Sequence, residues 1–172
     1  MTAALSPSPD RPAITVASAL LGTLTVAPSA VFDLPGGLRG FEALHSFALV
    51  PAVREGLFWL QSLEAPDCVF LLGDPFIAAP DFTTELSDTD RAQLGLGEAT
   101  DALVLAVITL PAGGPPPLDQ PTMNLRGPVV FNTARGLARQ IVFATDGFDF
   151  RAPVAIDRYP PRASGGIAPS SI

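Results

Sequence analysis

Apolar residues along this chain occur in short runs separated by Gly- and Pro-rich segments, a pattern typical of β structure rather than of a helical bundle. The runs are rich in β-branched and aromatic residues. The pair Asp146-Gly147 supplies the positive φ of a tight hairpin turn between the last two runs. We therefore predict a small closed or nearly closed antiparallel sheet. Its expected strands are residues 19–26, 46–50, 57–63, 69–72, 82–86, 103–110, 129–131, 140–145 and 148–150.

One helix is predicted among these strands. Ser87 offers an N-cap hydroxyl, and Asp88 and Asp90 place acidic side chains in the first turn. Gly95 and Gly97 then mark the end of the helix. The expected fold is mainly β: a small antiparallel β-barrel-like single domain with one short helix.

The ends of the chain differ in composition from its middle. Residues 1–16 and 158–172 are rich in Pro, Ser, Ala and Gly, and we predict that both are disordered tails. The β-barrel-like domain is then expected at residues 17–157. Within it, residues 111–121 (PAGGPPPLDQP) are expected to form a long loop, because Pro lacks a backbone donor and fixes its own φ.

Charge limits the kinds of partner. The basic residues are all Arg, and 17 acidic residues against 10 basic ones give a formal net charge of -7. Such a chain repels a phosphate backbone on average, so direct nucleic-acid binding is disfavoured. An acidic surface instead suits a basic protein partner, although the charge is also explained by solubility alone.

Motifs for nucleotide, metal or nucleophilic chemistry are missing from the sequence. A Walker loop needs a Lys that the chain lacks, and Gly36-Gly37-Leu38-Arg39-Gly40 has the wrong spacing for a dinucleotide fingerprint, so we interpret it as a tight turn. His45 is the only histidine, which excludes sites with several imidazoles, and no Gly-x-Ser-x-Gly elbow accompanies it. Cys68 stands alone in an apolar run and reads as a buried small side chain. No metal or cofactor is expected.

Carboxylates are grouped in the middle of the chain. They allow three interpretations: a solvated rim, an acidic contact surface, or a glycosidase-type pair whose separation only the fold decides. The group consists of Glu64, Asp67, Asp74, Asp81 and Glu85.

Three side-chain amides lie inside or beside apolar strands. Asn124, Asn132 and Gln140 would each cost on the order of 1–3 kcal/mol if buried without a partner. We expect hydrogen bonds that fix loops, with ligand binding as the alternative.

Three stretches of the chain carry distinctive motifs. They are FDLPGGLRGFE at residues 32–42, FWLQSLE at residues 58–64 followed by Asp74-Pro75, and NLRGPVVFN at residues 124–132 with Gln140 downstream. Together they resemble the flagellar assembly factor FliW family. The first is similar to the family's opening motif, the second to its W-L-Q-S-hydrophobic-E run, and the last to a third motif, in which Gly127 replaces the usual Ala. The order and spacing agree from about residue 22 to about residue 154.

The resemblance implies a protein without catalysis that acts in the bacterial cytoplasm. Proteins of this family bind CsrA, an RNA-binding translational regulator, and relieve its repression of flagellin synthesis; they also bind flagellin, so the circuit is a partner switch. We expect the CsrA-facing surface to consist of acidic residues in the middle loops, with two amides shaping the site. The residues are Glu64, Asp67, Asp74, Asp81, Asn124 and Asn132.

Two alternatives remain open at this point. One is a small hydrolase or ligand-binding barrel that uses carboxylates at its mouth. The other is a module of a secreted assembly, because Arg11 precedes an apolar stretch at residues 13–30 that has some features of a signal peptide. The Thr and Ser spacing in that stretch is strand-like, and residues 1–10 carry no positive charge, so we expect a cytoplasmic protein.

Overall fold

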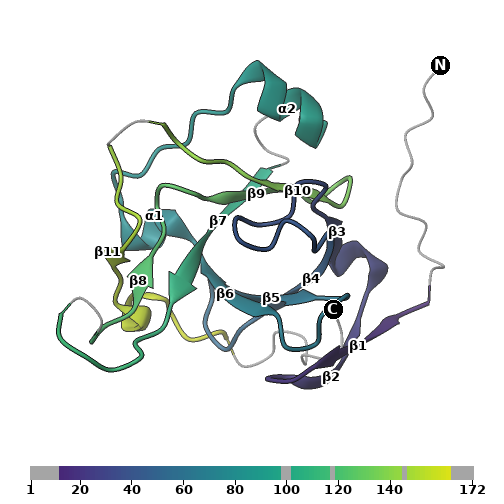
Figure 1. Ribbon diagram of the computed structural model, residues 1–172, viewed down its shortest axis with the longest axis horizontal. Coiled ribbons are helices and arrows are strands. Elements are labelled where there is room, and N and C mark those ends of the chain that lie inside the picture. The colour runs from purple at the N-terminus through teal and green to yellow at the C-terminus, as the bar shows by residue number, and fades with distance from the viewer. Residues whose placement is uncertain (1–11, 98–101, 117–118, 145–146, 164–172) are drawn as a thin grey trace.

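A closed barrel forms the centre of the molecule (Figure 1). In the computed structural model, which describes residues 12–97, 102–116, 119–144 and 147–163, the ring of strands runs β7-β6-β5-β4-β3-β10-β9, and β9 pairs back onto β7. Neighbours pair antiparallel except β10 and β3, which meet in parallel at Leu137 and Asp33. The predicted mainly β, barrel-like fold is confirmed. The barrel strands are β3 (Val31–Asp33), β4 (Ser46–Pro51), β5 (Leu57–Ser62), β6 (Val69–Gly73), β7 (Ala102–Thr109), β9 (Val129–Asn132) and β10 (Leu137–Gln140).

Apolar side chains fill the barrel interior. Alternate residues of each strand point inward, as the pleat requires, and Phe32 meets Phe131 edge-to-face with ring centroids 5.0 Å apart. Two residues of the loop between β3 and β4, Leu34 and Leu38, are buried in the same core. The buried members of this core are Phe32, Leu34, Leu38, Phe47, Leu49, Leu60, Leu72, Leu105, Val129, Phe131 and Ala138.

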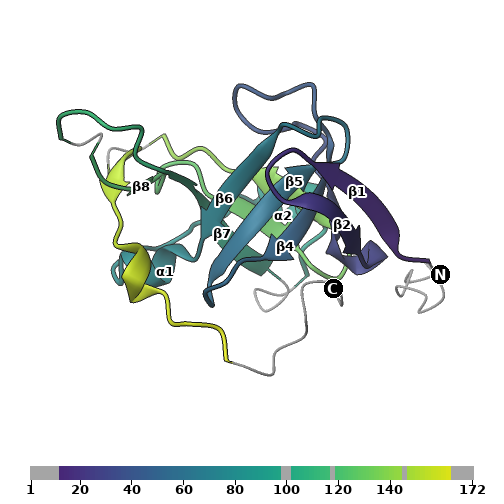
Figure 2. The same ribbon diagram turned by 90° about the horizontal axis from the view of Figure 1, so that it is seen from below.

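Other elements cover the outside of the barrel. The hairpin of β1 and β2 lies across β4 and β5 (Figure 2), where Val16 and Val26 pack on Ala48 and Val50. Because much of the barrel wall is buried on both faces, its strands are nearly continuously apolar instead of alternating. The hairpin strands are β1 (Ile14–Ser18) and β2 (Gly22–Val26), followed by the 3-10 helix η1 (Pro28–Ala30).

A second cover comes from the chain after β6 and from the C-terminal part. Its apolar residues pack on Leu71, Ala106 and Ile108 of the barrel wall. Tyr159 is fully buried there, and its hydroxyl donates a hydrogen bond of 2.8 Å to the carbonyl of Asp74. The elements are α1 (Pro75–Ala78), β8 (Thr122–Met123), β11 (Ala152–Pro153) and η3 (Ile156–Arg158).

The predicted helix is confirmed as α2 (Asp88–Leu94). Ser87 caps it by accepting a hydrogen bond from the backbone N–H of Asp90, and Gly95 ends it with φ +62°. Leu94 packs on Val130 of β9, which holds the helix against the barrel. No helix in the described part of the chain has the length and apolar content to cross a bilayer.

Three predicted strands, at residues 82–86, 140–145 and 148–150, are wrong in whole or in part. Residues 82–86 contain no strand: Phe82 is buried, and its ring lies 5.0 Å from that of Phe148 as part of the outer cover. Residues 141–144 and 148–150 are not strands either, because pairing stops at Gln140; residues 145–146 lie outside the described residues. Phe82, Phe143 and Phe148 pack on the barrel wall without a strand ladder, so composition alone mispredicts these segments.

The ordered domain also extends beyond its predicted bounds. β1 begins at Ile14, inside the expected tail at residues 1–16, because it pairs with β2 from Ile14 to Ser18. Tyr159 lies in the core although it falls within the expected tail at residues 158–172. Residues 1–11 and 164–172 lie outside the described residues.

Candidate functional site

One end of the barrel is plugged by the loop between β3 and β4 (Figure 1). Two tight turns build this loop: Gly37 N–H donates to the carbonyl of Leu34 at 2.8 Å, and Phe41 N–H donates to that of Leu38 at 2.7 Å. Gly37 and Gly40 have φ of +61° and +88°, so the glycines supply the left-handed conformations that the turns need. The tight turn predicted from the sequence is confirmed.

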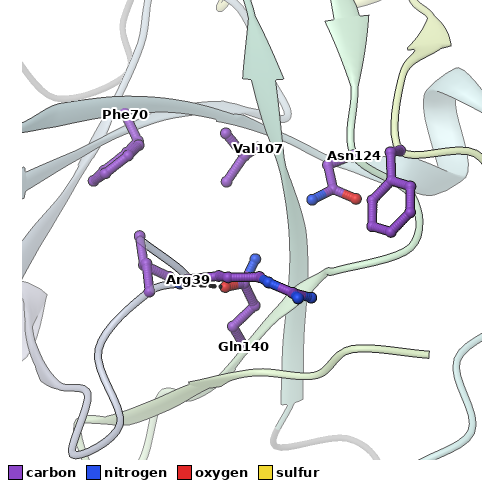
Figure 3. A pocket seen from close by; sticks show the side chains of 7 residues that line it. Arg39, Phe70, Val107, Asn124 and Gln140 are labelled. Carbon is purple, nitrogen blue, oxygen red and sulfur yellow. Dashed lines mark hydrogen bonds between the residues drawn. The ribbon is translucent and has the colours of Figure 1, made fainter. Parts of the chain in front are cut away.

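A cavity of about 270 Å³ opens beside this loop (Figure 3). Its lining comes from segments far apart in the sequence: the loop itself, the start of β6, the late part of β7, the segment before β9, the end of β10 and the C-terminal part. Two of the three motif stretches, residues 32–42 and 124–132, contribute to it, and Phe70 lies a few residues after the third, residues 58–64. The lining residues are Leu38, Arg39, Phe70, Val107, Asn124, Gln140 and Phe150.

Gln140 fastens the loop to the opposite side of this cavity, which we call the mouth of the barrel. Its Oε1 accepts a hydrogen bond of 2.8 Å from Arg39 N–H, drawn in Figure 3, and its Nε2 donates one of 3.0 Å to the carbonyl of Gly127. Both the oxygen and the nitrogen of the amide are thus hydrogen-bonded to the backbone. The expectation that this amide fixes a loop is confirmed for Gln140.

Asn124 is placed differently. Its Oδ1 accepts a hydrogen bond of 3.1 Å from Arg126 N–H, which orients the amide so that Nδ2 faces the cavity (Figure 3). Among the described residues this Nδ2 donates no hydrogen bond. Asn124 therefore presents a free donor to whatever enters the mouth.

Gly127 makes room for both amides. A Cβ at this position would lie 3.1 Å from Asn124 Nδ2 and 3.1 Å from Gln140 Nε2. The Ala that the family resemblance leads one to expect would press on both nitrogens. The position at which this chain differs from the family motif, residue 127, thus lies at the mouth.

Arg39 is the positively charged residue among those that line the mouth. Its exposed side chain extends across the cavity between Asn124 and Gln140 (Figure 3), and within the described residues its guanidinium makes no hydrogen bond or ion pair. Glu42 is a nearby carboxylate on the same loop, but its Oε1 accepts from Gly40 N–H at 2.9 Å. That bond is the largest cause that lowers the pKa of Glu42, followed by its own N–H, with the charge of Arg39 a minor cause.

Exposed aromatic rings flank the cavity. Phe41 is 43% exposed and stands edge-to-face on Phe70, with ring centroids 5.0 Å apart. Phe150 is 51% exposed, and the Arg126 guanidinium lies 4.8 Å from its ring centroid. The apolar lining of the cavity thus continues onto the surface around it.

The predicted acidic residues lie at two ends of the β5–β6 hairpin. Glu64 and Asp67 are in the loop that joins β5 to β6, near the mouth, whereas Asp74 follows β6 and Asp81 follows α1, at the other end. The structure does not bring the four carboxylates together.

Two of these carboxylates are engaged with backbone N–H groups. Oε2 of exposed Glu64 accepts from His45 N–H at 2.6 Å and Ser46 N–H at 3.1 Å, and these bonds, His45 first, lower the pKa of Glu64. Oδ1 of Asp74 accepts from Phe76 N–H at 2.8 Å and caps α1. Asp67 and Asp81 are exposed and make no side-chain hydrogen bond or ion pair to any described residue.

Asn132 is buried and serves the backbone. Its Nδ2 donates to the carbonyls of Leu94 at 2.9 Å and Gly95 at 3.2 Å, and its Oδ1 accepts from Ala134 and Arg135 N–H, both at 3.1 Å. It ties the end of α2 to the end of β9. At 2% exposure this side chain has no face for a partner.

Sequence reasoning missed several residues of this site. Arg39, Phe70 and Phe150 line the mouth, whereas the sequence alone predicts only a turn at Arg39. Outside the mouth, sequence reasoning also misses Gln61, which is fully buried and whose Nε2 lies 3.0–3.3 Å from the carbonyls of Ser62, Ala65, Pro66 and Cys68 in the β5–β6 loop. An amide in the middle of an apolar strand was the available signal for Gln61.

The alternative of a hydrolase or ligand-binding barrel is not favoured by this geometry. The barrel interior is filled, and the described lining of the mouth contains no carboxylate. No cluster of His, Cys, Asp and Glu in the described ranges is placed to hold a metal ion. Burial, and then Asp67, raise the pKa of the Cys68 thiol, which disfavours a reactive thiolate.

Comparison with known proteins relates the whole barrel to one family. The family model described as FliW protein matches residues 15–154. The flagellar assembly factor FliW of Treponema pallidum (strain Nichols) is 36% identical over 126 residues, which cover 73% of this chain and 81% of that protein. The one of Syntrophotalea carbinolica is 39% identical over 119 residues, covering 69% of this chain and 81% of that protein.

A solved structure supports the same fold. A crystal structure of the flagellar assembly factor FliW superposes with a TM-score of 0.71, covering 81% of this chain and 96% of that chain. The sequence identity in that superposition is 22%, so the likeness concerns the fold.

Proposed function

Because this chain belongs to the FliW protein family, we propose that it is a non-enzymatic flagellar assembly factor that binds a CsrA-type translational regulator and also binds flagellin. Binding to the factor keeps CsrA from repressing flagellin synthesis. Free flagellin displaces CsrA from the factor, and CsrA then stops further flagellin translation. Both partners belong to the cytoplasm, where we place this protein.

The observation that carries the proposal is the family match over residues 15–154, which spans the whole barrel and its mouth. Two of the motif stretches, residues 32–42 and 124–132, meet at this mouth, although they lie far apart along the chain. The formal net charge of -7 adds support, because an acidic protein attracts a basic RNA-binding partner and raises the encounter rate.

The exchange of partners requires that each partner weakens the binding of the other. Such coupling is reciprocal: if flagellin lowers the affinity for CsrA by some factor, CsrA lowers the affinity for flagellin by the same factor. Overlapping surfaces and separate, coupled sites both satisfy this condition.

The carboxylates proposed to contact CsrA differ in whether their substitution changes only the charge or also the local structure. Glu64 and Asp74 hold backbone N–H groups, so their substitution also disturbs local structure. Asp67 and Asp81 are free of such bonds among the described residues and lie at opposite ends of the β5–β6 hairpin. They therefore report separately on the two ends.

The experiment is a titration of purified CsrA at low and high salt, with the unmodified protein and with Asp67→Lys and Asp81→Lys. We expect saturable binding that weakens with salt, and about fivefold weaker binding for the reversal at the contacting end. Asp67→Asn and Asp81→Asn are the matched controls, which remove one charge without adding the opposite one. If neither reversal changes CsrA affinity, the acidic placement is wrong.

A pull-down from cells complements the titration. Recovery of flagellin without CsrA would indicate a factor dedicated to flagellin. Recovery of neither would mean that the chain shares the family's fold without its partners.

A further inference from the structure

We propose that the mouth of the barrel, lined by Leu38, Arg39, Phe70, Val107, Asn124, Gln140 and Phe150, is a docking site for a peptide segment of a partner protein in which an acidic residue is flanked by large apolar residues. This proposal goes beyond the partners proposed above, because it assigns a chemistry to this surface whichever protein carries the segment.

The polar groups of the mouth decide the charge of the occupant. Arg39 offers a guanidinium without a hydrogen bond or ion pair in the described part of the chain, and Asn124 offers a free Nδ2 donor. Gln140 has both ends of its amide occupied by backbone groups and adds no strong preference. A carboxylate, which accepts hydrogen bonds and donates none when ionised, complements these two donors.

The local charge is opposite to that of the whole protein. The formal net charge is -7, yet the described residues that line the mouth include an Arg and no carboxylate. Glu42 is the nearby carboxylate on the loop, and it is held by Gly40 N–H. Complementarity therefore favours an acidic group at this place on an acidic protein.

The apolar surface of the mouth favours large apolar residues on either side of the acidic residue of the peptide. Phe70, Val107 and Leu38 form the walls, and exposed Phe41 and Phe150 extend the apolar area beyond the rim. Aromatic residues of this kind, partly exposed and next to Arg, are enriched among residues that dominate binding energy.

The size of the cavity favours a peptide over a small molecule. About 270 Å³ lies just below the range of roughly 300–1,000 Å³ that holds drug-sized ligands. One or two side chains fill such a space, while the flanking residues of the same segment lie on Phe41 and Phe150 outside it.

The test is fluorescence anisotropy with a labelled, amidated peptide Ser-Gly-Leu-Phe-Glu-Leu-Gly-Ser and the same peptide with Gln in place of Glu. We expect saturable binding of both to the unmodified protein, with the Glu peptide about two- to fivefold tighter, as one partly exposed ion pair allows. Arg39→Gln should abolish that preference and leave the binding of the Gln peptide unchanged. Phe150→Ala should weaken both peptides about tenfold.

Matched control variants are available elsewhere on the surface. Phe76 is 46% exposed on α1, so Phe76→Ala removes an equally exposed ring away from the mouth. Arg158 is exposed in η3, so Arg158→Gln removes an equivalent charge. Both should leave peptide affinity within about twofold, and thermal melting verifies that every variant is folded.

Several outcomes would overturn the proposal. Equal affinity for the Glu and Gln peptides, a preference that survives Arg39→Gln, or binding unaffected by Phe150→Ala would each exclude this mouth as the acidic-peptide site. Full competition by hexanoate at the affinity of the peptide would assign the mouth to small carboxylates instead. Because no CsrA or flagellin is used, these results do not depend on the outcome of the CsrA titration.

Discussion

The mouth of the barrel and the wall beneath α2 are each organised by an asparagine from the same motif, NLRGPVVFN at residues 124–132, and the two asparagines do different things. Asn132, beneath α2, is 2% exposed and bonds four backbone groups. Asn124, at the mouth, is half-buried, uses its Oδ1 on one backbone N–H and turns its Nδ2 toward a cavity.

The difference shows that a polar residue in a recognisable motif marks a binding site only when it has hydrogen-bonding capacity left over. A buried amide whose donors and acceptors are all occupied stabilises the fold. The amide nitrogen of Asn124 and the neighbouring guanidinium of Arg39, which have no partner among the described residues, are instead available to another molecule.

The largest effect on the mouth is expected from a substitution in the β3–β4 loop, which builds it. Gly37→Ala places a Cβ 2.6 Å from the carbonyl oxygen of Phe41 and 2.7 Å from Cα of Glu42, at φ +61°. Both neighbours are backbone, so we expect a loss of about 3–4 kcal/mol of unfolding free energy. Urea unfolding measures it.

Gly36→Ala is the matched control for that variant. Its Cβ meets nothing within 4 Å, and its φ is not in the left-handed region. A similar loss for both variants would mean that the loop does not depend on the left-handed turn at Gly37.

The wall beneath α2 is tested by Asn132→Ala. The substitution leaves the carbonyl of Leu94 and the N–H groups of Ala134 and Arg135 without their side-chain partner. We expect a loss of about 2–3 kcal/mol in urea unfolding, because buried polar groups lose their hydrogen bonds. Peptide affinity at the mouth should stay within about twofold; a large change there would contradict the separation of the two regions.

The opposite result is expected for Asn124→Ala. Among the described residues only one hydrogen bond, from Arg126 N–H, is lost in a half-buried setting, so the unfolding free energy should fall by about 1 kcal/mol or less. Anisotropy titration should show a two- to fivefold weaker affinity for the Glu peptide, because a free donor is removed. An unchanged affinity would leave Arg39 as the only polar anchor of the mouth.

The smallest effect concerns an exposed carboxylate that is nevertheless structural. Hydrogen bonds from His45 and Ser46 N–H lower the pKa of Glu64 below its ordinary value of 4.5 in the folded protein. The unfolded chain therefore binds this proton more readily, and the stabilisation, present above pH 4.5, is lost as the pH falls through the lower folded pKa. Thermal melting of Glu64→Gln should show a shallower fall of Tm between about pH 5 and about pH 3 than the unmodified protein shows.

Asp67→Asn is the control in the same loop. Its carboxylate accepts no backbone N–H among the described residues, so it tests the removal of one charge alone. If both variants flatten the acid dependence equally, net charge explains the effect and the bonds of Glu64 do not.

Much of the fold follows from local sequence properties. The apolar runs at β4, β5, β6, β7 and β9 predict their strands, and Ser87 and Gly95 bound α2 as expected. The turns of the β3–β4 loop are also predictable from their glycines, because only Gly adopts such φ values without strain.

Other elements depend on partners distant in sequence. β10, with the sequence LARQ, becomes a strand because it pairs with β9 on one side and meets β3 on the other. Phe82 and Phe148 lie in segments that look like strands but pack as loops against the barrel wall. Local propensity does not distinguish these cases, because tertiary contacts decide them.

The mainly β barrel and its helix follow from local sequence, because hydrophobic periodicity, caps and turn glycines act over a few residues. The family follows from the resemblance of the three motif stretches. Which polar residues share a surface depends instead on how distant segments are arranged in space. The tertiary structure divided the carboxylates between two ends of a hairpin and buried Asn132, and it brought Arg39, Asn124 and Gln140 together from stretches far apart in the chain. Closure of the barrel sets these distances, and closure is a property of the whole ring of strands.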